Sequence, residues 1–413
     1  MPAEIITIGT ELLIGQVLDT NAASIASELM AVGIEVHFKT TVGDNERSIE
    51  AALRQALERS DIVIATGGLG PTEDDLTKKV FSRVLEKRLI LHDEILEKIR
   101  HRFSSRGLPM SPNNEKQALI PRGAKVLENP RGTAPGLLMC SGSKTVVALP
   151  GVPSEMRPIL VEQVIPYLCE SYKPGARTRS RILKTCSIGE SVVDQTLGDL
   201  IRASRNPTIG LLAYPGEVHI RLTARGSNEE EVEGLLSGLE GSIRERLGGH
   251  IFGRDAQTLE EVVGLLLREK GRTLALAESC TGGLIGHRLT NVPGSSDYFE
   301  RAVVAYSNRA MEALLGVPPE LLRSRGAVSR EVAEAMATGV RRPARTHLGL
   351  GVTGIAGPSG GSPEKPVGLV YIALATEEGV TSQEHRILGD REVNKFRASQ
   401  MALEMVRRYL LQI

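Results

Sequence analysis

Apolar and polar positions in the first 171 residues repeat as short strand patterns followed by longer helix patterns. Strand-helix alternation at this spacing is typical of a parallel sheet with helices on both faces. The predicted strands are Ala3–Gly9, Ile34–Gly43 and Asp61–Gly68, the predicted helices are Asp19–Gly33 and Glu46–Ser60, and a strand and helix follow from Lys144 to about Ser171.

The pattern changes between Tyr172 and Arg254, where strands alternate with single helices in α+β style. Tyr172–Arg177 and Gly248–Gln257 read as linkers. A third unit begins at the amphipathic segment Leu259–Gly271 and ends with a helix over Val393–Leu411. We therefore predict an α/β protein of three domains, with boundaries at 1–171, 172–254 and 255–413.

The amino-acid composition limits the kinds of binding partner that we expect for this protein. Acidic and basic residues balance at 50 each and Trp is absent, so neither a nucleic-acid surface nor an anionic membrane is expected as a partner. The four cysteines form no CxxC pair, which favours a reducing cytoplasm. Neither a signal peptide nor a stretch approaching the ~18 apolar residues of a membrane span is evident.

Three glycine-rich turns follow apolar strand patterns, at Thr66–Pro71, Ser279–Gly283 and Thr353–Pro358. In open α/β sheets, ligands bind where strands end, and glycine amides let a phosphate approach closely. Asp74 and Asp75 follow the first turn at a spacing suited to a divalent metal. An ordinary tight turn, with acidic residues complementing a helix N-terminus, remains the alternative interpretation.

Five motifs in order extend this picture: GTELLIGQVLDTN, TGGLGPTEDDLT, PNNEKQALIPRGA, NPRGTAPG and LPGVPSEM. Together they resemble the N-terminal half of the CinA family, which is similar to molybdopterin-binding domains. The resemblance implies a metal-dependent pyrophosphatase that converts ADP-ribose to AMP and ribose 5-phosphate. It implies a divalent ion (Mg²⁺, Mn²⁺ or Co²⁺), with K⁺ as an optional further ion.

On this resemblance, Asp74, Asp75 and Glu155 are assigned to the metal or to water activation. The expected substrate-binding residues on the N-terminal side are Gly67, Gly68, Gly70, Glu11, Asp19, Asn21 and Lys116. The segment Thr208–Ala224 resembles the family's small KH-type central domain. Since no GXXG loop in basic surroundings stands out, we expect a scaffold rather than an RNA-binding module.

In the second turn, Ser279 stands where a strand passes into a helix, a position that exposes a nucleophile and sets nearby amides as an oxyanion hole. A helix N-cap is the alternative role for this serine. Cys280 is a competing nucleophile, although a buried thiol is its more usual role.

The motifs AESCTGG, GSSDYFERAVVAYSN, GAVSREVAEAMA, VTGIAGPSGG and GDRE resemble the family's C-terminal domain. That domain is a nicotinamide mononucleotide amidohydrolase without a metal. The resemblance implies Ser279 as nucleophile, Tyr306 in proton transfer, Thr353 and Gly354 beside the substrate, and Arg391 at its phosphate. Thr281 and Gly282 are added as substrate-binding residues.

One position departs from the family pattern Tyr-Ser-Asn-x-x-Lys, because this chain reads YSNRAM and places Met311 where the lysine is expected. A thioether accepts no proton at neutral pH, and loss of a general base typically costs ~10²–10⁴-fold in rate. The C-terminal site is therefore either disabled or served by a relocated base, with Lys365 and Tyr306 as candidates.

A non-catalytic protein that binds a nucleotide or pterin, or that interacts with partners in competence, is the third hypothesis. The expected ligands are ADP-ribose and nicotinamide mononucleotide, and a homodimer is the default assembly.

Overall fold

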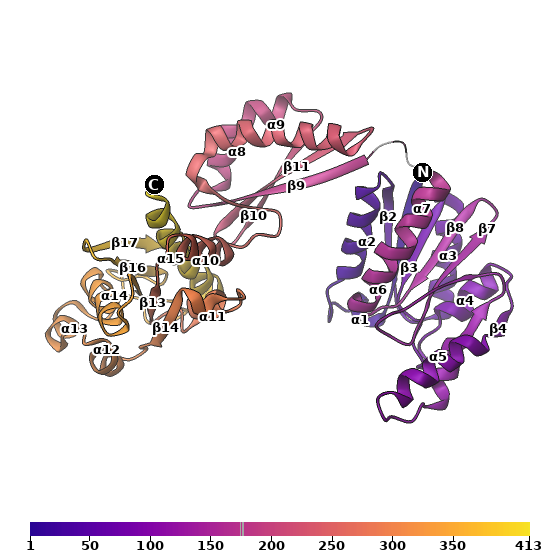
Figure 1. Cartoon of the computed structure of the whole chain (residues 1–413), viewed down its shortest axis with the longest axis horizontal. Coiled ribbons are helices and arrows are strands. Elements are labelled where there is room, and N and C mark those ends of the chain that lie inside the picture. The colour runs from indigo at the N-terminus through magenta and orange to yellow at the C-terminus, as the bar shows by residue number, and fades with distance from the viewer. Residues whose placement is uncertain (174, 176) are drawn as a thin grey trace. The chain divides into compact units, whose positions relative to one another are not determined.

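The structure is a computed structural model that describes residues 1–173, 175 and 177–413, so Pro174 and Ala176 of the expected first linker lie outside the described residues. The chain divides into two compact units. One comprises Met1–Arg179 with Arg225–Glu233, and the other comprises Ser180–Ala224 with Gly234–Ile413. Figure 1 labels most of the helices and many of the strands of both units.

A six-stranded sheet forms the centre of the N-terminal domain, in the order β2-β1-β3-β8-β7-β6. Four strands are parallel: β1 (Pro2–Ile8), β2 (Glu35–Val42), β3 (Ile62–Thr66) and β8 (Lys144–Leu149). β7 (Gly136–Ser141) and β6 (Lys125–Leu127) are antiparallel, unlike the purely parallel sheet expected. Only two residues separate β7 from β8, and so short a connection permits only an antiparallel hairpin.

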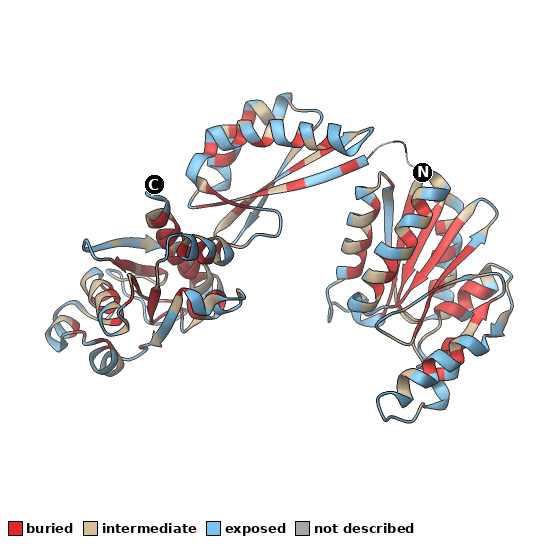
Figure 2. Ribbon diagram, in the orientation of Figure 1, coloured by how far each residue is buried: buried red, intermediate tan, exposed pale blue. Residues whose placement is uncertain are grey.

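Successive residues of the central strands enter different cores, because side chains of a strand alternate between its faces. Ile5 and Ile64 pack with one core, and Ile6 and Val63 with the other. All residues of β3 are buried, as its red ribbon in Figure 2 shows. The remaining elements are α1 (Thr10–Leu13), α2 (Thr20–Ala31), α3 (Glu46–Arg59), α4 (Thr77–Val84), β4 (Leu89–Leu91), α5 (Asp93–Ser104), β5 (Leu119–Pro121), α6 (Pro153–Ile159) and α7 (Ile165–Tyr172).

The middle domain has the expected α+β pattern, with a sheet in the order β10-β11-β9-β12. Its elements are β9 (Arg177–Cys186), α8 (Glu190–Ala203), β10 (Thr208–Tyr214), β11 (Glu217–Gly226), α9 (Glu229–Leu247) and β12 (Ile251–Arg254). β10 and β11 form a hairpin whose turn is Pro215–Gly216.

The C-terminal domain contains a five-stranded sheet in the order β14-β13-β15-β16-β17. β14 (Phe299–Val304), β13 (Leu274–Glu278) and β15 (Leu348–Gly354) are parallel, whereas β16 (Leu369–Ala375) and β17 (Val380–Arg386) are antiparallel. Its helices are α10 (Leu259–Glu269), α11 (Leu284–Thr290), α12 (Asn308–Leu315), α13 (Pro319–Arg325), α14 (Arg330–Ala344) and α15 (Arg391–Leu411). Among the described residues, none of the helices has the length and apolar character needed to span a membrane.

Glycines in β15 serve packing. Gly349 and Gly351 share a face of the strand, and both lie directly against α14. A Cβ atom on Gly351 would lie 2.5 Å from the Ala333 carbonyl oxygen and 2.7 Å from the Ala337 nitrogen. Backbone atoms inside a helix cannot yield as a flexible side chain would, so only glycine permits this spacing.

We predict that Gly351→Ala lowers the stability of the C-terminal domain by roughly 1–3 kcal/mol through overpacking, or roughly 3–10 °C in Tm. Differential scanning calorimetry of the full chain measures this change. Gly210→Ala is the matched control, because a Cβ atom at that β10 position meets nothing within 4 Å. Equal Tm values for the two variants would contradict the packing role.

Candidate functional sites

The ends of three parallel strands meet at one edge of the N-terminal sheet. Thr7, Thr66 and Leu149 are register partners across β1, β3 and β8. The Gly67 amide donates to the Leu149 carbonyl at 3.0 Å. The following loops surround a cleft of about 560 Å³, which is lined by Ile8, Gly9, Glu11, Asp44, Gly67–Pro71, Asp74, Asp75, Gln117, Thr133, Ala134, Pro150–Pro153 and Glu155.

Gly67 and Gly68 have φ angles of 107° and 65°, in the region that favours glycine. Side chains there would also collide with the Ile8 carbonyl and the Thr77 hydroxyl. Within the described residues, the amides of Gly68, Leu69 and Gly70 donate to no protein acceptor. Three consecutive unbonded amides beside a cleft offer an anion-binding loop.

The same cleft is strongly acidic. Its lining contains the carboxylates of Glu11, Asp44, Asp74, Asp75 and Glu155 and no lysine, arginine or histidine. The neighbouring Thr72 side chain is the main cause that lowers the pKa of Asp74, so this carboxyl is ionised at neutral pH. Asp75 Oδ2 accepts hydrogen bonds from the Thr72 amide (2.8 Å) and hydroxyl (2.5 Å), and Glu155 Oε2 accepts one from Asn129 Nδ2 (2.7 Å).

Asp74, Asp75 and Glu155 thus line one cleft, as the metal assignment requires. In the part of the chain that the structure describes, no three acidic, histidine or cysteine side chains already form a metal cluster. Mg²⁺ sites commonly use one or two carboxylates together with substrate phosphates and water. The donor set therefore fits a cation completed by a bound diphosphate, rather than a preassembled protein cage.

The other expected residues of this site have different positions. Glu11 lines the cleft, but Asp19, Asn21 and Lys116 do not. Asp19 caps α2 by accepting from the Ala22 amide. Asn21 Nδ2 donates to Thr66 Oγ1 (3.0 Å) and to the Gly151 carbonyl (2.7 Å). It thereby connects the end of β3 with the loop that follows β8. Lys116 pairs with Glu73.

The C-terminal sheet repeats the arrangement. Glu278 of β13 is the register partner of Val304 in β14 and Val352 in β15, so the next residues of all three strands meet at one edge. This edge brings together Ser279, Thr353 and the segment leading to Tyr306. The Ser279 amide donates to the Val352 carbonyl at 3.0 Å, and Ser279 Oγ makes no hydrogen bond with any described residue.

The carboxylate of Glu278 lies at the N-terminus of α11, where the free amides of a helix would otherwise bind an anion. This fully buried carboxylate accepts hydrogen bonds from the amides of Gly283 (3.0 Å), Ile285 (3.1 Å) and Gly286 (2.8 Å) at the start of α11. The amides of these three residues are consequently unavailable as an oxyanion hole. A lone acidic residue ending the apolar run LALAE was the available signal for this role.

The third turn is bonded to its neighbours. Arg391 donates to the Gly357 carbonyl (2.6 Å) and to the Tyr306 hydroxyl (3.0 Å), and thereby connects two candidate residues. Thr353 Oγ1 donates to the Ala327 carbonyl (2.9 Å). A side chain on Gly354 would lie 2.7 Å from the Leu369 carbonyl, so packing alone explains this glycine.

The surroundings of Cys280, Met311 and Lys365 show how far each could act as a nucleophile or a base. Burial raises the pKa of Cys280 to about 12, which leaves a neutral thiol. Met311 is only 1% exposed and belongs to an apolar cluster with Ala277 and Ala305. Lys365 Nζ donates to the carbonyls of Arg325 (2.6 Å) and Val328 (2.7 Å), so its ammonium is already bonded to protein.

Sequence reasoning also missed Lys78, which lies beside the acidic cleft region in α4. Its side chain is 6% exposed, and its ammonium donates to the Lys116 carbonyl at 2.6 Å. Burial lowers the pKa of Lys78 to about 8, against the opposing effect of the Asp75 charge.

Because the unfolded chain holds this proton up to a higher pH, stability should rise between pH 8 and about 10.5 as the folded state sheds it. We predict that Lys78→Met removes this rise and relieves a cost on the order of 3 kcal/mol below pH 8. The loss of the Lys116 contact partly offsets that relief. Calorimetry of parent and variant from pH 7 to 10.5 tests this, and parallel Tm profiles would contradict it.

Comparisons with known proteins cover the whole chain. Residues 4–170 match the model described as a probable molybdopterin binding domain, residues 180–253 match the damage-inducible protein CinA KH domain, and residues 256–410 match the CinA C-terminal domain.

Full-length relatives are similarly close. A protein of Moorella thermoacetica named "Putative competence-damage inducible protein" is 49% identical over 99% of both chains. A "CinA-like protein" of Dictyoglomus thermophilum is 46% identical over 100% of both. The crystal structure of a competence/damage inducible protein from Agrobacterium tumefaciens is 42% identical, with a TM-score of 0.36, over 37% of this chain and 94% of its own. The chain belongs to the CinA family of competence-damage inducible proteins.

Proposed function

We propose that the N-terminal domain is a metal-dependent pyrophosphatase that hydrolyses the diphosphate of a nucleotide such as ADP-ribose. The observation that carries this is the union, in one cleft, of three unbonded amides and five carboxylates. The amides of Gly68, Leu69 and Gly70 bind diphosphate oxygens. A divalent cation held by the carboxylates, when bound, would neutralise the diphosphate and acidify a water molecule.

The acidic lining itself favours a cation. A diphosphate entering a cleft with five carboxylates and no basic side chain would be repelled by like charges. Asp74 and Asp75, at the mouth of the glycine loop, and Glu155, at the start of α6, are the candidates to hold the cation and orient the water. Binding of a pterin, which the name of the matching domain model suggests, is the competing function for the same cleft.

We predict that the protein releases AMP from ADP-ribose only with a divalent cation. Asp75→Asn should lower kcat by roughly 100-fold or more, because it removes a charge while keeping an oxygen for the Thr72 contacts. Chromatography of AMP, with and without EDTA, measures both effects. Glu73→Gln is the matched control, since Glu73 pairs with Lys116 outside the cleft lining. Turnover that survives EDTA or Asp75→Asn would remove the assignment.

For the C-terminal domain, we infer an amidohydrolase fold whose activity on nicotinamide mononucleotide is limited by Met311. The supporting observations are an unbonded Ser279 hydroxyl at the convergence of three strands and a Tyr306 held by Arg391. Ser279 would attack the carboxamide, and Tyr306 would move a proton. The general base is the missing part, since the Lys365 ammonium is already bonded to backbone carbonyls.

We predict that Met311→Lys raises ammonia release from nicotinamide mononucleotide by roughly 10²–10⁴-fold, and that Ser279→Ala abolishes the gain. A lysine in this apolar cluster would be desolvated, which lowers its pKa and suits it to act as a base. Leu314→Lys, at an exposed position of the same helix, is the control and should change nothing. Rapid Ser279-dependent release by the parent would show that Met311 does not limit the site.

A further inference from the structure

Helix α11 begins directly after the turn that carries Ser279, and contacts at both of its ends determine where it lies. At its start, backbone amides donate to the carboxylate of Glu278, the residue before Ser279. Arg288 lies in the second turn of the same helix. Because α11 is only seven residues long, a shift of Arg288 would move the amides that bind Glu278, and the Ser279 backbone with them.

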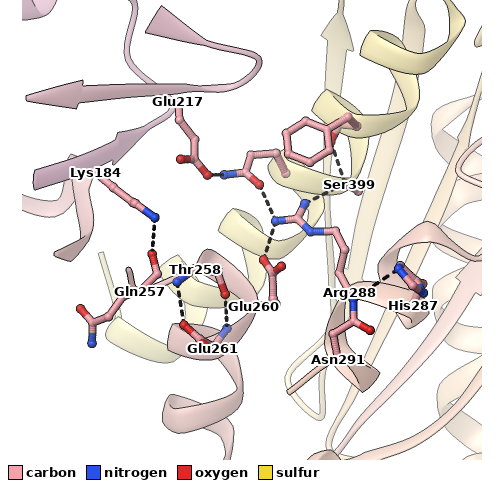
Figure 3. Close-up of polar contacts among 12 residues, drawn as sticks. Lys184, Glu217, Gln257, Thr258, Glu260, Glu261, His287, Arg288, Asn291 and Ser399 are labelled. Atoms are coloured by element: carbon pink, nitrogen blue, oxygen red, sulfur yellow. Dashed lines mark hydrogen bonds and ion pairs between the residues drawn. The ribbon is translucent and has the colours of Figure 1, made fainter. Parts of the chain in front are cut away.

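Groups from α10 and α15 surround the guanidinium of Arg288 (Figure 3). Its nitrogens donate to Ser399 Oγ (2.8 Å), Glu260 Oε2 (2.7 Å) and Gln400 Oε1 (2.7 Å). The ring of Phe396 lies beside the guanidinium, with 5.0 Å between Cζ of Arg288 and the ring centroid. Arg288 is only 6% exposed, so these charged hydrogen bonds are shielded from water and hold α11 firmly against α15.

Helix α15 also reaches the other side of the Ser279 site. Near its start, Arg391 donates to the Tyr306 hydroxyl (3.0 Å) and to the Gly357 carbonyl (2.6 Å). Gln400 lies nine residues farther along the same helix, a distance of about 14 Å at the usual helical rise. An α-helix bends only gently over such a length, so a contact that fixes α15 at Gln400 also fixes the place of Arg391 and its bond to Tyr306.

A residue of the middle domain completes this cluster. Glu217 of β11 accepts a hydrogen bond from Gln400 Nε2 at 2.6 Å, and Gln400 is 2% exposed. The preceding residue, Gly216, comes so close that a Cβ atom on it would lie 3.1 Å from Gln400 Cγ. A carboxylate only accepts and a guanidinium only donates, so Gln400 must turn Nε2 toward Glu217 and Oε1 toward Arg288. Glu217 therefore determines the orientation of the amide that Arg288 needs as an acceptor.

We propose that the middle domain positions the Ser279 site, with Glu217 as a positioning residue that acts through Gln400 and Arg288. This inference rests on the amidohydrolase function proposed above. Without Glu217, the amide of Gln400 can turn over, and its Nε2 hydrogens then face a guanidinium that has donors only. Arg288 loses a buried acceptor, and α11 and α15 no longer keep one relative position. The middle domain, expected as a scaffold, thereby takes part in arranging the neighbouring site.

Hydrogen–deuterium exchange of the full-length chain tests this coupling without a substrate. Glu217→Leu should speed exchange of the α11 amides by about 10-fold or more, because it removes the acceptor that orients Gln400, while amides of α14 keep the parent rates. Glu217→Gln retains an acceptor oxygen and should restore the parent rates in α11.

Lys184→Met is the matched control for the exchange measurement. It removes another contact of the middle domain, the 2.8 Å hydrogen bond from Lys184 Nζ to the Gln257 carbonyl, which involves neither α11 nor α15 (Figure 3). Its exchange rates should match those of the parent. Equal α11 exchange in the parent and Glu217→Leu would overturn the inference. Equal acceleration of α11 and α14 would also overturn it, because that result indicates a general loss of stability.

Ligand binding separates this inference from the proposed activity. In full-length protein carrying Ser279→Ala, calorimetric titration with nicotinamide mononucleotide should give roughly 10-fold weaker binding after Glu217→Leu, and parent affinity after Glu217→Gln or Lys184→Met. Unchanged affinity in Glu217→Leu would overturn this inference alone. If the Ser279→Ala protein does not bind the mononucleotide at all, the amidohydrolase proposal fails, and the exchange rates of α11 still decide whether Glu217 positions the Ser279 turn.

Discussion

Each candidate site depends on the convergence of parallel strands at one sheet edge. Parallel pairing brings the ends of β1, β3 and β8 together in one domain and those of β13, β14 and β15 together in another. Residues far apart in the sequence, such as Gly9, Gly67 and Gly151, thereby become neighbours. Because β1, β3 and β8 are buried on both faces, the hydrophobic core fixes the positions of the N-terminal loops that carry the polar groups.

The two sheet edges differ in whether the backbone amides of their glycine-rich turns are hydrogen-bonded within the protein. In the N-terminal domain, the loop Gly68–Gly70 has amides without protein acceptors, and carboxylates gather opposite them. In the C-terminal domain, Glu278 satisfies the corresponding amides with a covalently attached anion. Similar glycine-rich sequences therefore serve different purposes: one loop can accept an anionic ligand and a cation, whereas the other holds α11 rigidly behind Ser279.

The sequence predicted the fold class, the order of most elements and the family, because periodicity and ordered motifs are local properties. It also predicted that Asp74, Asp75 and Glu155 would line one cleft, since parallel strands place successive loops at one edge. The prediction of a parallel sheet missed the antiparallel β7, although Gly142 and Ser143 between two strand-like runs are a hairpin signal. The roles of Glu278 and Lys78 depend on tertiary neighbours, and no spacing rule shows that Gly351 faces helix α14 rather than a ligand.

The proposed function depends mainly on the loop Gly68–Gly70, whose backbone amides donate to no acceptor among the described residues. The most direct test is a crystal structure with Mn²⁺ and a non-hydrolysable methylene analogue of ADP-ribose, with the metal located by its anomalous signal. The account predicts diphosphate oxygens on the amides of Gly68–Gly70 and Mn²⁺ bridging them to Asp74, Asp75 or Glu155. A diphosphate bound away from this loop, or Mn²⁺ bound outside the cleft, would contradict it.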